Sequence, residues 1–349
     1  LYLDNAFSQA GPANENYARE LFELHTLGED RYYNHRYEKW SQVPGARSGM
    51  AEGYLDEDVY EAARAFTGWT VGMPAVVKGG LPETGEFVYY DPWHDHYQKR
   101  ILGAEFESHQ SPMADGRKVL DMLAAHPGTA QFLCKKICRW FVADDPPQSV
   151  VDRAAKTWMA HVDSEDQIAR TLRTILLSPE FTEHLGQKIK RPNHLILSIT
   201  RLTEAKLVPN ESVYGWMRAL GYYQFASPFP TGNPDGAAYW LDSDAMLKRW
   251  QTFAGLENIG AEKGIFAIDL DNIVPETCGS VRELIAVLAK RFWDGTVPKA
   301  IRKDLEAIFE TDAHGLTFEA MRREKPEQFE VKIKQLLGLM FMAPEFQRR

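Results

Sequence analysis

Two short stretches concentrate the side chains that could transfer protons or hold a metal. The first, "NENYARELFELHTLG" at residues 14–28, places Glu20, Glu23 and His25 within six positions. On a helix, Glu20 and Glu23 are neighbours at i and i+3, whereas His25 projects elsewhere. The three side chains therefore cannot all ligate one metal from this helix alone, although the two glutamates could serve as general acid and base.

The environment of Glu20 bears on whether this carboxylate has a catalytic or a structural role. At about 100° per residue, the wheel predicts a core face made of Tyr17, Leu21, Leu24 and Gly28. Glu20 then lies at the edge of this face, flanked by Leu24 and Leu27, and a carboxylate there is costly unless it is paired or hydrogen-bonded. Two interpretations stay open: a buried ion pair with Arg64 or another arginine, or a catalytic or metal-binding carboxylate. His25 is expected to be a hydrogen-bonded histidine at the other edge of the core face.

The second stretch is "DPWHDHYQKR", residues 91–100. In an extended segment His94 and His96 point to one side and Asp95 to the other. A pair of imidazoles could hold a divalent metal, which would activate water or polarise a carbonyl. Further ligands would have to come from Glu20, Glu23 or Asp91. The alternative is a solvated turn with hydrogen-bonded histidines.

Aromatic residues in predicted loops form a third group. They are Trp93, Tyr222, Tyr223, Phe229 and Trp240. Exposed rings of this kind stack on sugar faces, so that nearby carboxylates would suit glycoside hydrolysis. The alternative is that these rings hold long loops in place.

Helical periodicity dominates the rest of the chain and predicts the elements that position these groups. Asn14 is a suitable N-cap and Gly28 a suitable stop for the opening helix, and a second helix begins near Asp56. Further helices are predicted at 115–125, 127–142, 149–161, 165–177, 192–205, 210–220, 242–255, 279–290, 298–311 and 326–341. Residues 70–113 and the loop 222–241 break the pattern. We therefore expect a mainly α multi-helix assembly with a small β-containing insertion near 70–113. It would form one large helical domain over 1–349, with a possible subdivision into 1–190, which carries the motifs, and 191–349.

Composition excludes several classes of protein. The net charge of −9 argues against a broad nucleic-acid surface. There is no run of about 18 apolar residues, so no transmembrane helix is expected, and no phosphate-binding loop or Gly-x-Ser-x-Gly elbow occurs. Cys134 and Cys138 share a helix face; we interpret them as buried apolar residues rather than as a metal or redox pair. The chain opens mid-pattern at Leu1 without a signal peptide, which suggests a fragment or a processed form.

The ordered motifs resemble the bacterial family catalogued as domain of unknown function 1800. The resemblance rests on "YLDN", "NENYARELFELHTLG", "DVYEAARAFTGWTV", "HDHYQKRILG" and "FLCKKICRWFVADDPP". It covers most of residues 1–255, including "LGYYQFASPFPTGNPDGAAYWLDSDAMLKRW", and continues more weakly to the end. Members usually carry a further helical segment before "YLDN", are often exported, and are often encoded beside a sulfatase-like family. The resemblance therefore implies an extracytoplasmic, periplasmic or secreted, setting.

The resemblance also selects residues. The family motif includes Glu15, Arg19, Glu20, Glu23, Arg64, Trp69, His94, Asp95 and Lys99. His96 and the two helix cysteines depart from it, which weakens both the His-x-His metal site and the cysteine pair. The family itself has no assigned activity, so the resemblance indicates where a site lies and not what it does.

Two functions follow as hypotheses. The first is a hydrolase of an extracytoplasmic polymer, most plausibly a polysaccharide, with Glu20, Glu23, Asp95 and His94 as the catalytic group. Its substrate would be bound by Trp69, Trp93, Tyr222, Tyr223, Trp240, Arg64 and Lys99, and a divalent metal held by His94 and His96 could assist. The second is a non-catalytic surface or assembly protein whose polar motif is a structural ion-pair network.

Overall fold

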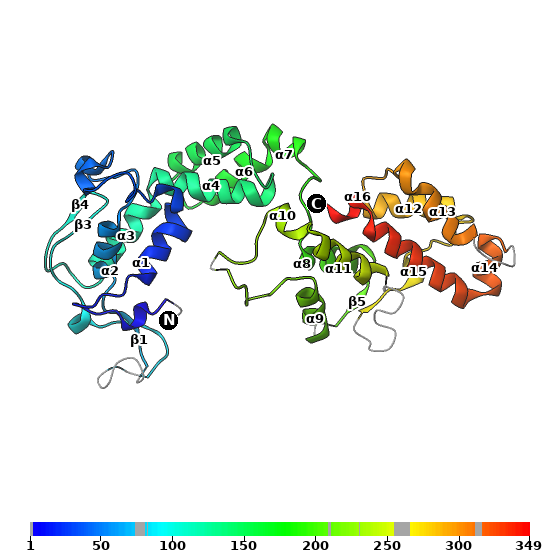
Figure 1. Ribbon diagram of the computed structural model, residues 1–349, viewed down its shortest axis with the longest axis horizontal. Helices are drawn as coiled ribbons and strands as arrows, with labels where there is room; N and C mark the ends of the chain where they lie inside the picture. Colours follow the sequence, from blue (N-terminus) through cyan, green and yellow to red (C-terminus); the bar gives the residue numbers. More distant parts are fainter. Residues whose placement is uncertain are drawn as a thin grey trace. The chain divides into compact units, whose positions relative to one another are not determined.

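The computed structural model describes residues 3–73, 81, 83–208, 211–229, 231–254, 266–310 and 316–349. The chain is mainly helical, as expected (Figure 1). It divides into two compact units, Leu1–Glu183 and His184–Arg349. This division falls close to the possible subdivision at residue 190, while the expectation of one large domain stays a prediction.

The opening motif forms two kinds of helix. Helix α1 spans Asn16–Glu20, and a π-helical segment, Leu21–Thr26, follows without a break. The N-cap is Glu15 rather than the predicted Asn14, one residue earlier, although Asn14 Oδ1 does accept a hydrogen bond from the N–H of Asn16, the first helical residue, at 3.0 Å. Gly28, with a φ of +85°, ends the helix as predicted.

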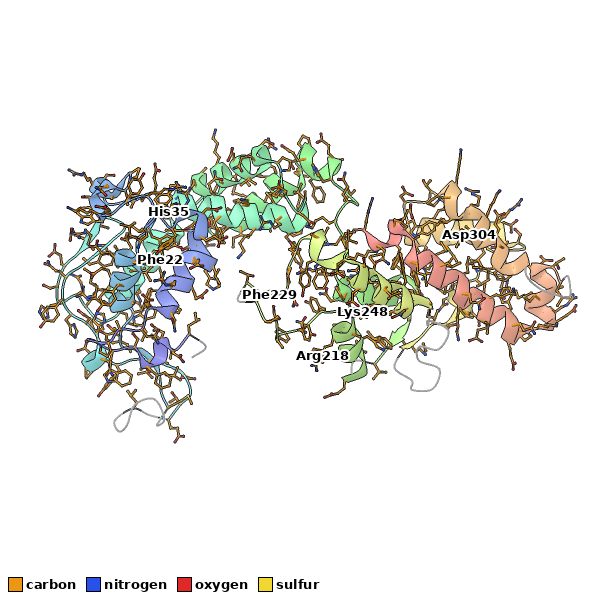
Figure 2. The ribbon with its side chains drawn as sticks, in the orientation of Figure 1. Phe22, His35, Arg218, Phe229, Lys248 and Asp304 are labelled. Atoms are coloured by element: carbon orange, nitrogen blue, oxygen red, sulfur yellow. The ribbon has the colours of Figure 1, made fainter. Side chains whose placement is uncertain are left out.

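The wide π turn changes which residues face the core. Leu27 N donates to the carbonyl of Phe22, five residues back, at 2.8 Å. The buried stripe is Ala18, Phe22, Thr26 and Leu27. Phe22, which is labelled in Figure 2, lies on this stripe. Its ring stacks on that of Tyr54, with the ring centroids 5.2 Å apart. The predicted core face is confirmed in part: Gly28 is buried, and Tyr17 and Leu21 are half-buried against the core cluster. The fully buried stripe, which begins at Ala18, is shifted by one residue from that prediction.

The rest of the first unit packs around α2, Asp56–Ala65. Tyr17 meets Phe66, just after this helix, edge-to-face at 5.0 Å. Two hairpins follow: β1 (Trp69–Val71) pairs antiparallel with β2 (Phe87–Tyr89), and β3 (Lys99–Ile101) with β4 (Ala104–Phe106). They confirm the predicted β-containing insertion. Short 3-10 turns lie at Asn5–Phe7, Glu29–Arg31, Trp40–Gln42, Ala46–Ser48 and Asp91–Trp93.

Five helices complete the first unit. They are α3 (Ala114–Ala124), α4 (Pro127–Phe141), α5 (Gln148–Ala160), α6 (Gln167–Leu176) and α7 (Pro179–Glu183). Helices α4, α5 and α6 lie side by side (Figure 1) around a common apolar cluster. Cys134 and Cys138 are fully buried in that cluster as free thiols, and burial raises the pKa of each. This is the apolar environment predicted for them.

The second unit is also helical. Its helices are α8 (Pro192–Leu202), α9 (Glu211–Ala219), α10 (Ala237–Trp240), α11 (Ser243–Ala254), α12 (Val281–Phe292), α13 (Lys299–Glu310), α14 (Phe318–Glu324), α15 (Pro326–Met342) and α16 (Pro344–Gln347). A short pair, β5 (Lys206–Leu207) with β6 (Phe266–Ala267), and a 3-10 turn at Leu270–Asn272 complete it. Helix α15 packs against α11, α13 and α14. None of the helices described in either unit is long and apolar enough to cross a membrane.

Candidate functional site

Four polar residues that the family resemblance singles out come together near the end of α2: Arg64, His94, Asp95 and Lys99. Arg64, in the last turn of that helix, holds Asp95 through two parallel bonds: Nε to Oδ2 at 2.9 Å and Nη2 to Oδ1 at 3.0 Å. Its third nitrogen, Nη1, donates to both carboxylate oxygens of Glu61, at 2.7 and 2.8 Å. Such a fork-to-fork contact is the strongest arrangement of an arginine and a carboxylate. We call Glu61, Arg64, Thr67, His94, Asp95, Lys99 and Asp115 the buried network.

Lys99 is the most deeply buried charged member of the network. Its side chain is fully buried at the start of β3. Its Nζ donates to Asp115 Oδ2 at 2.7 Å and to the backbone carbonyls of Asp95 and Tyr97 at 2.5 and 2.8 Å. All three N–H groups of the ammonium are therefore used, which is the condition for burying a lysine without large cost.

His94 is fixed by Thr67 and Asp115. Its Nδ1 lies 2.9 Å from the carbonyl oxygen of Thr67, so this nitrogen carries the proton and donates it. Its Nε2 lies 3.4 Å from Asp115 Oδ2. The hydroxyl of Thr67 donates to the carbonyl of Arg64 at 2.6 Å and accepts from the N–H of Asp95 at 2.8 Å. Both ring nitrogens of His94 thus face groups of the network.

The network holds its two aspartates in the charged form. Burial by itself raises the pKa of Asp95, but hydrogen bonds from Arg64 and from the N–H of Tyr97, together with the charges of Arg64 and Lys99, outweigh it and lower the pKa. The pKa of Asp115 is lowered against its burial in the same way, by His94 and Lys99. Asp115 Oδ1 nevertheless is buried and has no hydrogen-bond partner among the described residues.

The two glutamates of the opening motif do not join the network. Glu20 and Glu23 are half-buried, and within the described part of the chain neither carboxylate has an assigned hydrogen bond or ion pair. Arg64 is occupied by Asp95 and Glu61, so the ion pair proposed between Arg64 and Glu20 is wrong. His25 is exposed rather than at the core edge, because the π turn rotates it outward.

The two histidines predicted to hold a metal lie next to each other. The rings of His94 and His96 are nearly perpendicular, with centroids 5.0 Å apart. His96 Nε2 lies 3.6 Å from Asp91 Oδ2, and its ring stacks on His109 at 5.9 Å. Among the described residues, no group of three or more potential ligands is arranged to hold a metal. A metal at His94 and His96 stays a prediction.

The predicted substrate-binding aromatics in the first unit line its core. Trp69 packs edge-on against Phe66 at 5.3 Å and Phe87 at 5.5 Å. Trp93, in the 3-10 turn before His94, is half-buried and packs edge-on against Tyr90 at 5.6 Å. Arg64 and Lys99, also predicted to bind substrate, belong to the network.

The remaining predicted aromatics belong to the second unit. Trp240 is buried, with 1% of its surface exposed, and its Nε1 donates to the carbonyl of Pro234 at 2.9 Å. Tyr222 is buried, and the backbone of Tyr223 is bonded on both sides by the amide of Asn233. These contacts hold the loop 222–241 in place, and a stacking role for the rings stays a prediction.

Three members of the network were not singled out from the sequence. Asp115 lies in the first turn of a predicted helix, where an acidic residue is ordinary. Glu61 lies three residues before Arg64 on one helix, a spacing that does predict contact. Thr67 gave no signal, since a threonine after a helix is common in any protein.

The comparisons with known proteins yield one match. No curated protein and no solved structure matches this sequence. A family model described as "Protein of unknown function (DUF1800)" matches residues 1–348, which extends the resemblance of the N-terminal motifs over nearly the whole chain. The chain therefore belongs to the DUF1800 family.

Proposed function

We propose that this chain is a non-catalytic surface or assembly protein, and that its family motif is a structural ion-pair network. The observation that carries the proposal is the closed pairing of Arg64 with Asp95 and of Lys99 with Asp115. A general acid or base must reach its substrate and have a pKa near the working pH. Asp95 has both oxygens bonded to Arg64 and a lowered pKa, so it is a poor base.

The network also has the form expected of a structural lock. It joins the end of α2, the segment from His94 to Lys99 and the first turn of α3, which are held together by little regular backbone pairing. Burying ions rarely adds stability relative to apolar side chains, but it does fix one arrangement of the elements. We infer that the family motif specifies this arrangement.

The setting we propose is outside the cytoplasm, because that is what the family resemblance implies. The three cysteines do not oppose it, since all are buried free thiols that need no partner. The net charge of −9 supports a partner other than nucleic acid. A polymeric, carbohydrate-like partner remains part of the proposal.

A rescue experiment tests the network. Lys99→Met leaves the Asp115 carboxylate buried without its ammonium, and should lower the melting temperature strongly. Adding Asp115→Leu removes the remaining charge, and a structural network predicts that the double variant regains most of the lost stability. The same variants should be compared with wild type in assays of reducing-end release from a panel of polysaccharides. Release by wild type that is lost in a folded Asp95→Asn variant would overturn the proposal.

A polysaccharide hydrolase is the second candidate, and one observation favours it. The π-helical segment Leu21–Thr26 lies within the family motif, and π turns often mark functional sites. Glu20 and Glu23, at its start and within it, would then be acid and base. Glu20→Gln and Glu23→Gln should each abolish such release while leaving the melting temperature unchanged. Elemental analysis of protein purified without chelator tests the metal: near-unit stoichiometry would support assistance by His94 and His96.

A further inference from the structure

A polar groove lies in the first unit, apart from the network. It has a volume of about 470 Å³ and is open to solvent rather than enclosed. Its walls come from the chain that follows the π-helical segment and from the N-terminal parts of α4 and α5. The lining residues include Arg31, Tyr33, Gln131, Phe132, Lys135 and Asp152. The volume is within the range of about 300–1,000 Å³ that is usual for ligand sites.

Two glycines shape the groove. A Cβ on Gly28 would lie 2.6 Å from the ring of Phe132, so only a glycine lets this ring take its place in the wall. A Cβ on Gly128 would lie 2.8 Å from Arg31 Nε. The family motif that ends in "LHTLG" is therefore linked to the groove by the close approach of Phe132 to its last residue.

One wall carries an ordered set of polar groups. Asp152 Oδ1 accepts hydrogen bonds from the side-chain amides of Gln148 at 2.8 Å and Gln131 at 3.2 Å. The carboxylate of Asp152 and the two side-chain amides are therefore adjacent. Among the contacts of the described residues, the two amide oxygens and Asp152 Oδ2 accept no hydrogen bond, so they can accept one from a ligand. Lys135 adds N–H donors to the same groove, so donors and acceptors are both present.

The charges of the groove balance. Two acids, Asp30 and Asp152, face two bases, Arg31 and Lys135. Arg31 is anchored by a bond from Nη1 to the carbonyl of Glu52 at 2.6 Å. A groove with no net charge gives no preference to a strongly anionic or cationic ligand. Its two half-buried rings, Tyr33 and Phe132, offer apolar faces among the polar groups.

We propose that this groove binds a short stretch of a neutral polysaccharide. Each hydroxyl of a sugar donates one hydrogen bond and accepts others, which matches the mixed donors and acceptors around Asp152. The C–H faces of a sugar ring suit the faces of Tyr33 and Phe132. An open groove lets a polymer chain pass through without needing its end. The groove shares no residue with the buried network, so the proposal does not depend on the function proposed for the network.

The experiment is calorimetric titration of the full chain with soluble oligosaccharides. The probes are neutral β-1,4-linked glucan and mannan hexasaccharides, hexagalacturonate as an acidic counterpart, and an unstructured polar peptide. Asp152→Asn keeps one acceptor oxygen for Gln131 and Gln148 but removes the charge and turns the free Oδ2 acceptor into an N–H donor, and should weaken binding of a neutral hexasaccharide about tenfold or more. The matched control is Asp163→Asn, an exposed carboxylate away from the groove, which should bind as wild type does. Tyr33→Leu, which keeps an apolar side chain but removes the ring, should also weaken binding.

The outcomes separate the two proposals. Binding of a neutral hexasaccharide that Asp152→Asn weakens and Asp163→Asn does not supports the groove. Three results overturn it: binding only to hexagalacturonate or to the peptide, no binding to any probe, or binding of a neutral hexasaccharide with the same affinity in Asp152→Asn as in wild type. Cleavage of a bound hexasaccharide would instead contradict the non-catalytic function while leaving the groove as its binding site.

Discussion

Arg64 and Asp95 face each other fork to fork, with Nε–Oδ2 at 2.9 Å and Nη2–Oδ1 at 3.0 Å. The two residues are 31 positions apart in the sequence, and the family resemblance singles out both. Their contact uses both oxygens of the carboxylate. Two residues that the sequence suggested for catalysis and substrate binding are therefore bonded to each other.

Removing one partner of the pair should be costly. Asp95→Asn leaves Arg64 half-buried with only Glu61 as counter-ion, and we expect a loss of about 3 kcal/mol in the free energy of unfolding. Urea unfolding followed by circular dichroism measures it. The control is Asp166→Asn, which breaks the exposed i, i+4 pair with Arg170 and should change stability little. Equal effects of the two variants would contradict a structural role for the network.

The network should make the first unit sensitive to acid. The pKa of Asp95 and of Asp115 is lower in the folded protein than the value of about 3.9 expected for an unfolded chain. Their contribution to stability is therefore fully present above the unfolded pKa and is lost as the pH falls through the folded values. Melting temperatures measured between pH 7 and pH 2 should fall below about pH 4. The fall should be shallower in a variant carrying Asp95→Asn and Asp115→Asn; an identical pH profile would exclude these two groups as its cause.

Gly28→Ala should destabilise the chain through both backbone and packing. The φ of +85° disfavours any side chain, and the new Cβ would lie 2.6 Å from Phe132. We expect a loss of more than about 1 kcal/mol, measured by thermal or urea unfolding. Gly11→Ala is the matched control, because Gly11 also has a positive φ, +98°, but nothing lies within 4 Å of its Cβ position. A loss of unfolding free energy no larger than that of Gly11→Ala would show that the ring of Phe132 moves aside to accommodate the new Cβ.

The helix cysteines should be unreactive in the folded protein. Burial raises the pKa of Cys134 to about 12 and that of Cys138 to about 11, so almost no thiolate exists at neutral pH. A disulfide reagent added at pH 8 should label neither residue until denaturant is present. Rapid labelling of the native protein, located by peptide mass mapping, would show that α4 opens or that the pair is redox-active.

Trp240 tests whether the loop aromatics are anchors. Trp240→Ala removes a buried ring and its bond to Pro234, and should cost about 3–5 kcal/mol. Trp250, with 46% of its surface exposed on α11, is the control, and Trp250→Ala should cost much less. If Trp240→Ala instead left stability unchanged but removed binding of a polysaccharide, the result would support the prediction that this ring stacks on a sugar.

The sequence alone determined most of the secondary structure, because the signals are local. Apolar spacing placed α4 at 127–142 and α15 at 326–341, within a residue of their observed ends. Gly28 marked the end of the opening helical stretch, since a positive φ depends on neighbouring backbone only, and Asn14 marked its start to within one residue of the observed N-cap, Glu15. The family resemblance likewise identified four of the seven members of the buried network, namely Arg64, His94, Asp95 and Lys99.

Only the tertiary structure decided what those residues contact. The sequence suggested Glu20 as a partner of Arg64 and did not connect Arg64 with Asp95, whereas the fold brings Asp95 to the arginine. The π turn at Leu21–Thr26 and the packing of Phe22 on Tyr54, a contact across 32 positions of sequence, were likewise not predicted. The buried network and the polar groove each combine side chains from segments that are far apart in the sequence. The residue type fixes which hydrogen bonds and charges a side chain can offer, but only the fold determines which other side chains lie close enough to pair with it.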